Sequence, residues 1–337
     1  MPSRRYIDCH AHLTLGQFDG AELESSLERC AAEDIYVVAV SENLDECWSM
    51  RELWHGSRNV EATSPVSAEP STRLRALYRR QVALCLGLHP AQLAVQKGPD
   101  DSVGSSYRSV HPDQWPAFLS FSEPLLLTST PAAVSPYVGI GEVGLDFTPH
   151  VLRNDVATDG STRQRTVFRR HAELAQRHGL PLNIHSRQAG RHILDELEAL
   201  GYGANSTAVG SQPAVLLHAF DGKPSVVRRG LALGCYFSIA PIVVREPAFQ
   251  RLVTLVPIDR LVLESDSPAL GPVKGETNHP YNVILAARYV AEAKGITVEE
   301  VAHRTTQNAL RIFPRLCQLW PWAADYAAEF GTTTPET

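Results

Sequence analysis

The sequence has little that would assign it to a specialised class of protein. Its 337 residues include 31 Lys and Arg against 37 Asp and Glu, and the formal net charge of −6 provides no general basic field for nucleic acid. The six cysteines are scattered and form no C-x-x-C pair, so reduced thiols are favoured over a disulfide framework. No apolar run approaches the roughly 20 residues of a membrane-spanning helix. What remains, 44% hydrophobic and 20% charged residues, is the composition of a globular protein with a sizeable core.

A secretory signal is also missing, because the chain enters a predicted strand at about residue 5. Cleavage of a targeting peptide there would remove His10 and His12, which are among the candidate site residues below. We therefore expect a cytoplasmic or nuclear protein that is neither secreted nor transmembrane and has no membrane partner.

Short runs rich in Val, Ile and Leu alternate with longer amphipathic stretches, which is typical of repeated β-α units. Strands are predicted near residues 5–9, 35–41, 83–88, 138–143, 181–185, 214–218, 235–239 and 261–266. Helices are predicted at 20–32, 45–55, 163–179, 190–200, 224–233, 244–256, 281–294 and 298–313. This alternation predicts the α/β class and a TIM-like (β/α)8 barrel, in a single domain that covers residues 1–323.

Three segments interrupt the alternation, at residues 57–72, 98–136 and 202–213. They depart from the β-α rhythm, and the first two exceed an ordinary connection, so we expect surface insertions of low order. Segment 98–136 has an alternative interpretation, in which it forms one wall of a pocket. It precedes a predicted strand that bears a candidate ligand, so it could lie beside the site. Residues 324–337 are expected to form a frayed C-terminal tail.

Imidazole and carboxylate side chains stand at the C-terminal ends of five predicted strands. They are His10, His12, Glu142, His185, His218 and Asp266. His10 and His12 are two residues apart, so both project from one face of a strand and can hold a cation together. Glu142 lies in an apolar strand, where an anion is costly to bury unless a cation or an Arg pairs with it. Because the C-terminal strand ends of a (β/α)8 barrel meet at one face, these side chains predict a metal site.

The number and kind of these ligands favour two cations over one. A closed structural zinc site uses four ligands, whereas this set is larger and mixes imidazole with carboxylate. Glu142 can bridge two ions, and Asp266 can bind one of them and take a proton from the water that the two metals activate. The residues alone therefore indicate a binuclear metallohydrolase with two divalent ions per subunit, of Zn²⁺, Mn²⁺ or, less readily at imidazoles, Mg²⁺.

Further polar residues lie near the same strand ends. His89 stands between the run ALCLGL and Pro90, where we predict a contact with substrate. Arg187 can bind a phosphate through two hydrogen bonds, with a surface ion pair as the alternative. Asp8 is interpreted as a strand-end hydrogen-bond acceptor and Asp146 as a cap of the following loop. The remaining histidines fall in predicted helices and loops, where they are expected to face solvent.

The motifs together resemble one known family. They are DCHAHL (8–13), LGLHP (86–90), GEVGLD (141–146), NIHSR (183–187), LLHAFDG (216–222), ESDSP (264–268) and TTQNAL (305–310). This combination looks like the TatD-type metal-dependent deoxyribonucleases of the amidohydrolase superfamily. The longer strings HSRQAGR, HAFDGKPSV and ESDSPALGP are similar to the eukaryotic TatD domain-containing 3 branch. The resemblance runs from about residue 6 to 315, and the three insertions and the tail depart from it.

The resemblance implies a TIM-like barrel and hydrolysis of DNA phosphodiester bonds, commonly as a 3′-to-5′ exonuclease supported by Mg²⁺, Mn²⁺ or Zn²⁺. It implies the same six strand-end residues as metal ligands. The expected partner is then DNA with single-stranded or frayed 3′ ends, and a monomer is favoured.

Two other functions remain open. An amidohydrolase acting on a small ester, amide or phosphoester shares the barrel and most of the ligands, and the acidic net charge favours a small substrate. Many such enzymes bridge their metals with a carbamylated Lys, whereas Glu142 stands at the corresponding strand here, which favours the nuclease. A non-enzymatic scaffold would gain nothing from converging buried histidines.

Overall fold

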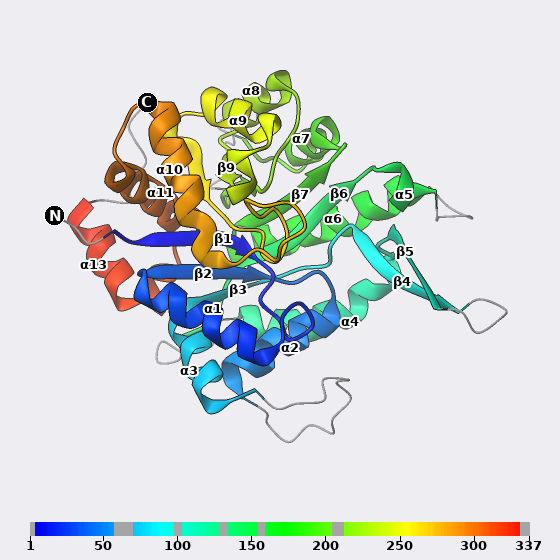
Figure 1. Cartoon of the computed structure of the whole chain (residues 1–337). Coiled ribbons are helices and arrows are strands. Elements are labelled where there is room, and N and C mark those ends of the chain that lie inside the picture. Colours follow the sequence, from blue (N-terminus) through cyan, green and yellow to red (C-terminus); the bar gives the residue numbers. More distant parts are fainter. Residues whose placement is uncertain are drawn as a thin grey trace.

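A closed barrel of parallel strands forms the centre of the protein (Figure 1). The structure is a computed structural model that describes residues 4–56, 70–97, 103–127, 134–153, 159–203 and 212–330. Around the barrel the strand order is β1-β10-β9-β8-β7-β6-β3-β2. These strands are β1 (Tyr6–Ala11), β2 (Ile35–Val40), β3 (Val82–Leu86), β6 (Tyr137–Asp146), β7 (Leu182–Arg187), β8 (Val215–Leu217), β9 (Tyr236–Ile239) and β10 (Leu261–Leu263). Each overlaps one predicted strand, and the TIM-like barrel is confirmed.

Helices surround the barrel (Figure 1). They are α1 (Gly20–Ala32), α2 (Leu44–His55), α3 (Thr72–Gln81), α4 (Trp115–Leu126), α5 (Pro149–Leu152), α6 (Gly160–His178), α7 (Gly190–Ala199), α8 (Pro224–Ala232), α9 (Pro247–Leu255), α10 (Val283–Lys294), α11 (Val298–Ile312), α12 (Leu316–Leu319) and α13 (Pro321–Phe330). The predicted helices are all present, whereas α3, α4, α5, α12 and α13 were not predicted. Among the described helices, none has both the length and the apolar character that crossing a membrane requires.

The segment between β3 and β6 corrects the expectation of low order for residues 98–136. Strands β4 (Ala91–Lys97) and β5 (Val103–Ser109) pair antiparallel, with Leu93 opposite Tyr107, and α4 follows them. This hairpin leaves the barrel directly after β3, so it stands beside the mouth at the C-terminal ends of the strands (Figure 1). Residues 57–69, 98–102, 128–133 and 204–211, which fall in the three predicted insertions, lie outside the described residues.

The last helices close the barrel at the end opposite the mouth. Trp320 and Tyr326 belong to a buried cluster that also contains strand residues such as Val38 and Leu216. Trp320 packs on Tyr36 near the start of β2, with ring centroids 4.8 Å apart. The prediction of a frayed tail from residue 324 is therefore wrong for 324–330, which belong to α13, and residues 331–337 lie outside the described part of the chain.

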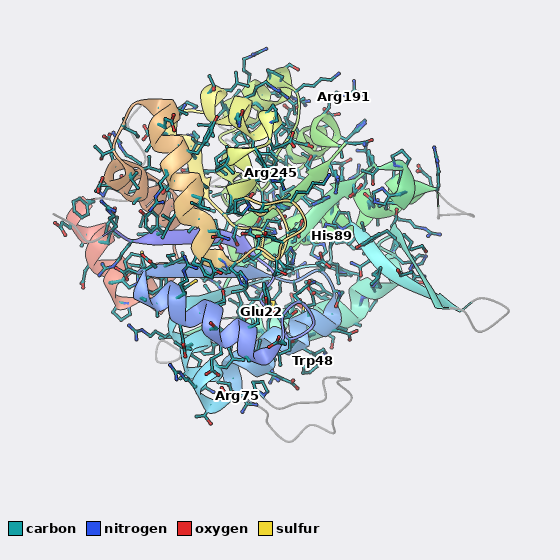
Figure 2. The ribbon with its side chains drawn as sticks, in the orientation of Figure 1. Glu22, Trp48, Arg75, His89, Arg191 and Arg245 are labelled. Carbon is teal, nitrogen blue, oxygen red and sulfur yellow. The ribbon has the colours of Figure 1, made fainter. Side chains whose placement is uncertain are left out.

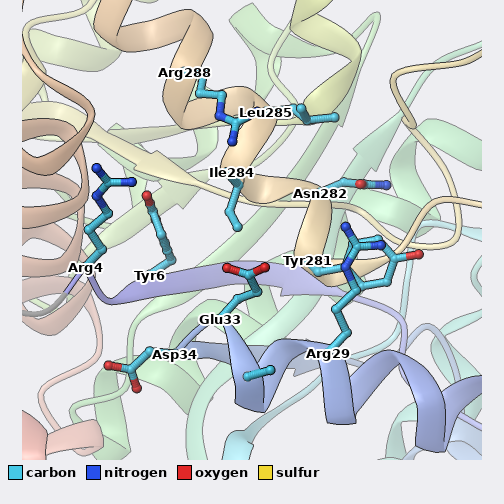
Figure 3. Close-up of a pocket in the computed structure, with 11 residues that line it drawn as sticks. Arg4, Tyr6, Arg29, Glu33, Asp34, Tyr281, Asn282, Ile284, Leu285 and Arg288 are labelled. Atoms are coloured by element: carbon cyan, nitrogen blue, oxygen red, sulfur yellow. The ribbon is translucent and has the colours of Figure 1, made fainter.

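A cavity of about 470 Å³ lies on the outside of the barrel, between α1 and the start of α10 (Figure 3). Arg29, Arg288 and Tyr281 are among its lining residues, and the Arg29 guanidinium lies 3.8 Å from the centre of the Tyr281 ring. None of the strand-end residues predicted from the sequence lines this cavity. This cavity is therefore separate from the candidate site that the sequence predicts.

Candidate metal centre

His10, His12 and Asp266 meet on one side of the mouth. The His10 and His12 Nε2 atoms are 3.4 Å apart, and the Asp266 Oδ1 atom is 3.5 Å from each. The Asp266 amide donates to the His10 carbonyl at 2.8 Å, which fixes the loop after β10 against β1. Asp266 adopts a φ of 54°, a left-handed conformation that Asp tolerates better than most residues. The predicted strand 261–266 in fact ends at Leu263, and the loop that follows it carries the carboxylate.

Glu142 lies at the centre of the cluster and is 2% exposed. Its Oε1 atom is 2.6 Å from the His218 Nε2 atom and 2.9 Å from the His185 Nδ1 atom. Its Oε2 atom is 3.4 Å from the His10 Nε2 atom and 3.3 Å from the His12 Nε2 atom. The His89 Nε2 atom also lies 3.3 Å from Oε1, so each oxygen of this carboxylate faces a different group of imidazoles.

Charge compensation around Glu142 is strong. Burial alone would raise the pKa of Glu142, but His218, His89 and His10 together hold it well below its usual range. Burial alone would likewise lower the pKa of His218, yet the neighbouring Glu142 carboxylate raises it to about 10. The surrounding imidazoles thus compensate the buried anion, and a divalent cation held by the same residues would supply the same compensation.

The spacing of the donor atoms fits a small divalent ion. A tetrahedral Zn²⁺ with bonds of about 2.1 Å places its ligand atoms about 3.4 Å apart. His10, His12 and Asp266 show distances of 3.4 to 3.5 Å between their donor atoms. On the other side, His89, Glu142 and His185 each offer a donor atom within 4.8 Å of the other two. The residues present therefore fit divalent cations, and their individual roles as ligands stay predictions.

Two residues that the sequence analysis missed lie behind the imidazoles, where Asn183 hydrogen-bonds one ring and Glu264 lies near another without a hydrogen bond. The His10 Nδ1–H donates to the Asn183 Oδ1 atom at 2.9 Å, which turns Nε2 toward the centre. The Glu264 carboxylate lies 3.7 Å from the His218 Nδ1 atom. A carboxylate or amide behind a ligand imidazole fixes its tautomer and its direction. Asn183 and Glu264 each stand two residues before a predicted ligand, which places them in the same motifs and is the signal that could have found them.

The two neighbouring aspartates behave differently. Asp8 accepts from the Ser265 amide at 2.8 Å and from the His10 amide at 3.2 Å, as expected of a strand-end acceptor. Asp146 accepts from the Thr148 amide at 2.9 Å and so caps its loop, but its other oxygen also lies 3.2 Å from the His185 Nε2 atom. The loop cap therefore also orients a candidate ligand.

His89 and Arg187, the predicted substrate contacts, occupy different depths. The His89 Nε2 atom is 3.3 Å from the Glu142 Oε1 atom, so this residue belongs to the cluster itself. Figure 2 shows His89 where the β4–β5 hairpin joins the barrel. Arg187 is exposed at the end of β7, and its side chain makes no hydrogen bond or ion pair with the residues that the structure describes.

His171 contradicts the expectation that the remaining histidines face solvent. It is fully buried in α6, where its Nδ1–H donates to the Val167 carbonyl at 2.9 Å. Its Nε2 atom accepts from the Leu88 amide at 3.3 Å, so the ring is neutral and burial lowers its pKa to about 3. The helix thereby holds the strand end that leads into His89.

Comparisons with known proteins identify relatives of this chain. A family model described as "TatD related DNase" matches residues 7–314. The human protein named "Deoxyribonuclease TATDN3" is 36% identical over 93% of this chain and 96% of its own length. The Bacillus subtilis "Uncharacterized metal-dependent hydrolase YabD" is 28% identical over 91% of this chain and 98% of its own.

A solved structure shares the fold. YJJV, a TatD homologue from Escherichia coli K12, has a TM-score of 0.65 at 20% identity and covers 92% of this chain and 98% of its own. With the family model matched over nearly the whole barrel and a relative more than one third identical, this chain belongs to the TatD related DNase family.

Proposed function

We propose that the protein is a 3′-to-5′ exodeoxyribonuclease that hydrolyses DNA phosphodiester bonds with two divalent cations in the barrel mouth. The observation that carries this proposal is the position of Glu142, whose two oxygens face separate groups of imidazoles. A carboxylate in that position can serve two cations at once. Membership in the TatD related DNase family supports the choice of DNA as substrate.

Different residues of the centre are assigned to cation binding and to proton transfer. Bound divalent cations make water more acidic and neutralise charge on phosphoryl oxygens. His10 and His12, with Asp266, would hold one cation, and His185 and His218 would hold the other, while Glu142 would serve both. The Asp266 carboxylate accepts the proton of the attacking water, because it remains 14% exposed whereas the Glu142 carboxylate is only 3% exposed.

The substrate contacts lie around the mouth. The exposed Arg187 guanidinium neutralises a phosphate next to the bond that is cleaved, since no described residue competes for it. His89 contacts the bound phosphate from within the cluster, and its place beside Glu142 and His185 also suits a cation ligand. The β4–β5 hairpin forms one wall of the mouth.

Product analysis tests the reaction and its polarity. Single-stranded DNA labelled at its 5′ end is incubated with the purified protein and Mn²⁺, alongside the Glu142→Ala variant. A ladder that shortens from the 3′ end, absent with the variant, is the expected result. Cleavage at internal positions from the first time points would reject the exonuclease and leave a metal-dependent endonuclease.

A small-molecule amidohydrolase is the second candidate, and the net charge of −6 favours it because no general basic field attracts a polymer of phosphates. An intact oligonucleotide at high enzyme concentration would move the proposal to small esters, amides or phosphoesters. The six free cysteines, of which five are buried, support a reducing compartment, and we place the protein in the cytoplasm or nucleus.

A further inference from the structure

Glu42 stands just after β2 and belongs to none of the motifs singled out in the sequence. Its backbone is held from three directions. The carbonyl accepts from the His89 amide at 2.7 Å and from the Gln92 Nε2 atom at 2.7 Å. The amide donates to the Glu46 Oε2 atom at 2.8 Å. These contacts fix the backbone of Glu42 at the mouth of the barrel.

The same corner is tied to the backbone of Glu142. The Glu142 amide donates to the Ser41 carbonyl at 3.0 Å, directly before Glu42. Gly87 permits this approach, because a Cβ atom at that position would lie 2.6 Å from the Glu142 carbonyl oxygen. Contacts of the main chain therefore hold Glu42 and Glu142 close together, whatever rotamers their side chains adopt.

The side chains converge as the backbones do. A carboxylate oxygen of Glu42, one of Glu142 and a ring nitrogen of His12 all lie within 4.8 Å of one another. Within the described part of the chain, no hydrogen bond or ion pair involves the Glu42 carboxylate. Two carboxylates at this distance repel each other unless a positive charge lies between them. His12 also has a buried ring nitrogen, Nδ1, without a hydrogen-bond partner.

We propose that Glu42, Glu142 and His12 form a third cation subsite, beside the two positions of the proposed function, on which this inference rests. Two of its three ligands are carboxylates, a donor set that suits hard cations such as Mg²⁺ or Mn²⁺. Glu42 is only partly buried, so this subsite faces the solvent and the incoming substrate. It binds its ion more weakly than the imidazole-rich positions do, and it exchanges that ion more readily.

Cation stoichiometry tests the subsite without any substrate. The full chain is freed of metal with a chelator and titrated with Mn²⁺, and bound and free Mn²⁺ are separated by electron paramagnetic resonance. Glu42→Gln keeps the shape of the side chain and removes its charge. Glu46→Gln is the matched control, because Glu46 belongs to no candidate metal group, and the Gln oxygen can still accept from the Glu42 amide while the nearby negative charge is removed.

Wild type and Glu46→Gln are expected to bind one more Mn²⁺ per chain than Glu42→Gln, or to bind the weakest ion at least about tenfold more tightly. Equal stoichiometry and equal affinities in all three proteins would overturn the subsite. Cleavage of labelled DNA is measured on the same preparations. Loss of one Mn²⁺ in Glu42→Gln together with no DNA cleavage in wild type would reject the proposed nuclease and keep the subsite.

Discussion

Asp266 combines two properties at the residue scale that rarely occur together. Its Oδ1 atom lies 3.5 Å from two imidazole nitrogens, yet the side chain remains 14% exposed to solvent. The backbone holds it through the amide that donates to the His10 carbonyl. A carboxylate placed in this way can bind a cation and still reach a water molecule, which is why we assign the general base to it.

Asp266→Asn separates these two roles. The amide oxygen can still face a cation, but it does not accept the proton of the attacking water. We expect kcat for DNA cleavage to fall by about 10²- to 10⁴-fold, the usual contribution of a general base. Turnover is measured together with an Mn²⁺ titration. Normal cation binding with full turnover would show that another group takes the proton.

Asn183 acts through His10 and not on the substrate. Asn183→Leu removes the oxygen that the His10 Nδ1–H meets at 2.9 Å, so the ring loses its fixed direction. We expect Mn²⁺ affinity to fall by about 10- to 100-fold, as is typical when the partner of a ligand imidazole is lost. Asn183→Asp keeps an acceptor at that place and should restore most of the affinity. If Asn183→Leu binds Mn²⁺ like wild type, the ring is held by other contacts.

The candidate site was largely predictable because the ligands follow one positional rule, the C-terminal end of a barrel strand. Glu42 obeys this rule, since it follows the run IYVVAV, but one intervening serine separates it from the strand. The orienting roles of Asn183 and Glu264 depend on distances to other strands. Such distances do not appear in the local sequence pattern, which shows only that both residues stand two positions before a candidate ligand.

At the scale of elements, prediction succeeded where burial is regular. Strands such as β2 (IYVVAV) and β3 (VALCL) are nearly continuous runs of buried apolar residues, and helices around the barrel have one apolar face. The hairpin was missed because β5 (VGSSYRS) is built from Ser and Gly, which are poor strand formers. Helix α3 was missed because it begins at Thr72, the end of a segment rich in Ser and Pro.

The contact between α6 and the end of β3 makes stability depend on pH through His171. Its pKa is about 3 in the folded protein and near 6.5 in the unfolded chain, so the unfolded state binds an extra proton between these values. The contribution of neutral His171 to the free energy of unfolding should therefore be fully present above pH 6.5. It should be lost progressively as the pH falls from 6.5 toward 3. Well below the unfolded pKa, the loss approaches about 1.4 kcal/mol per pH unit.

His171→Gln tests this contact, because the amide can still accept from the Leu88 N–H but does not titrate. Urea unfolding at pH 5 and pH 7 is compared in the two proteins. The variant is expected to lose less of its free energy of unfolding on acidification than wild type. Identical losses in both proteins would mean that His171 does not remain neutral in the folded state.

The helices that close the barrel and the candidate ligands lie at opposite ends of the molecule. The candidate ligands lie at the mouth, while α11, α12 and α13 close the other end around Trp320 and Tyr326 (Figure 1). Sequence analysis did not predict this closure. A short apolar segment near the end of a chain resembles a frayed tail in the sequence, and only the fold shows that this end of the barrel has to be covered.

Trp320→Ala should therefore destabilise the fold and spare the centre. Trp320 is 2% exposed, and removing a buried Trp side chain costs about 3–5 kcal/mol of unfolding free energy. Urea unfolding measures this loss, and Mn²⁺ affinity at 25 °C should stay that of wild type. A parallel loss of Mn²⁺ affinity would show that the two ends are coupled.

The most direct test of cation-dependent DNA hydrolysis at this centre is the cleavage rate of metal-free protein before and after Mn²⁺ is returned, in wild type and in Glu142→Gln. We predict no cleavage without metal, restored cleavage in wild type, and none in Glu142→Gln at the same Mn²⁺ concentration, because one neutral amide cannot serve two cations. Full cleavage by metal-free protein, or by Glu142→Gln after Mn²⁺ is returned, would contradict the assignment of the centre.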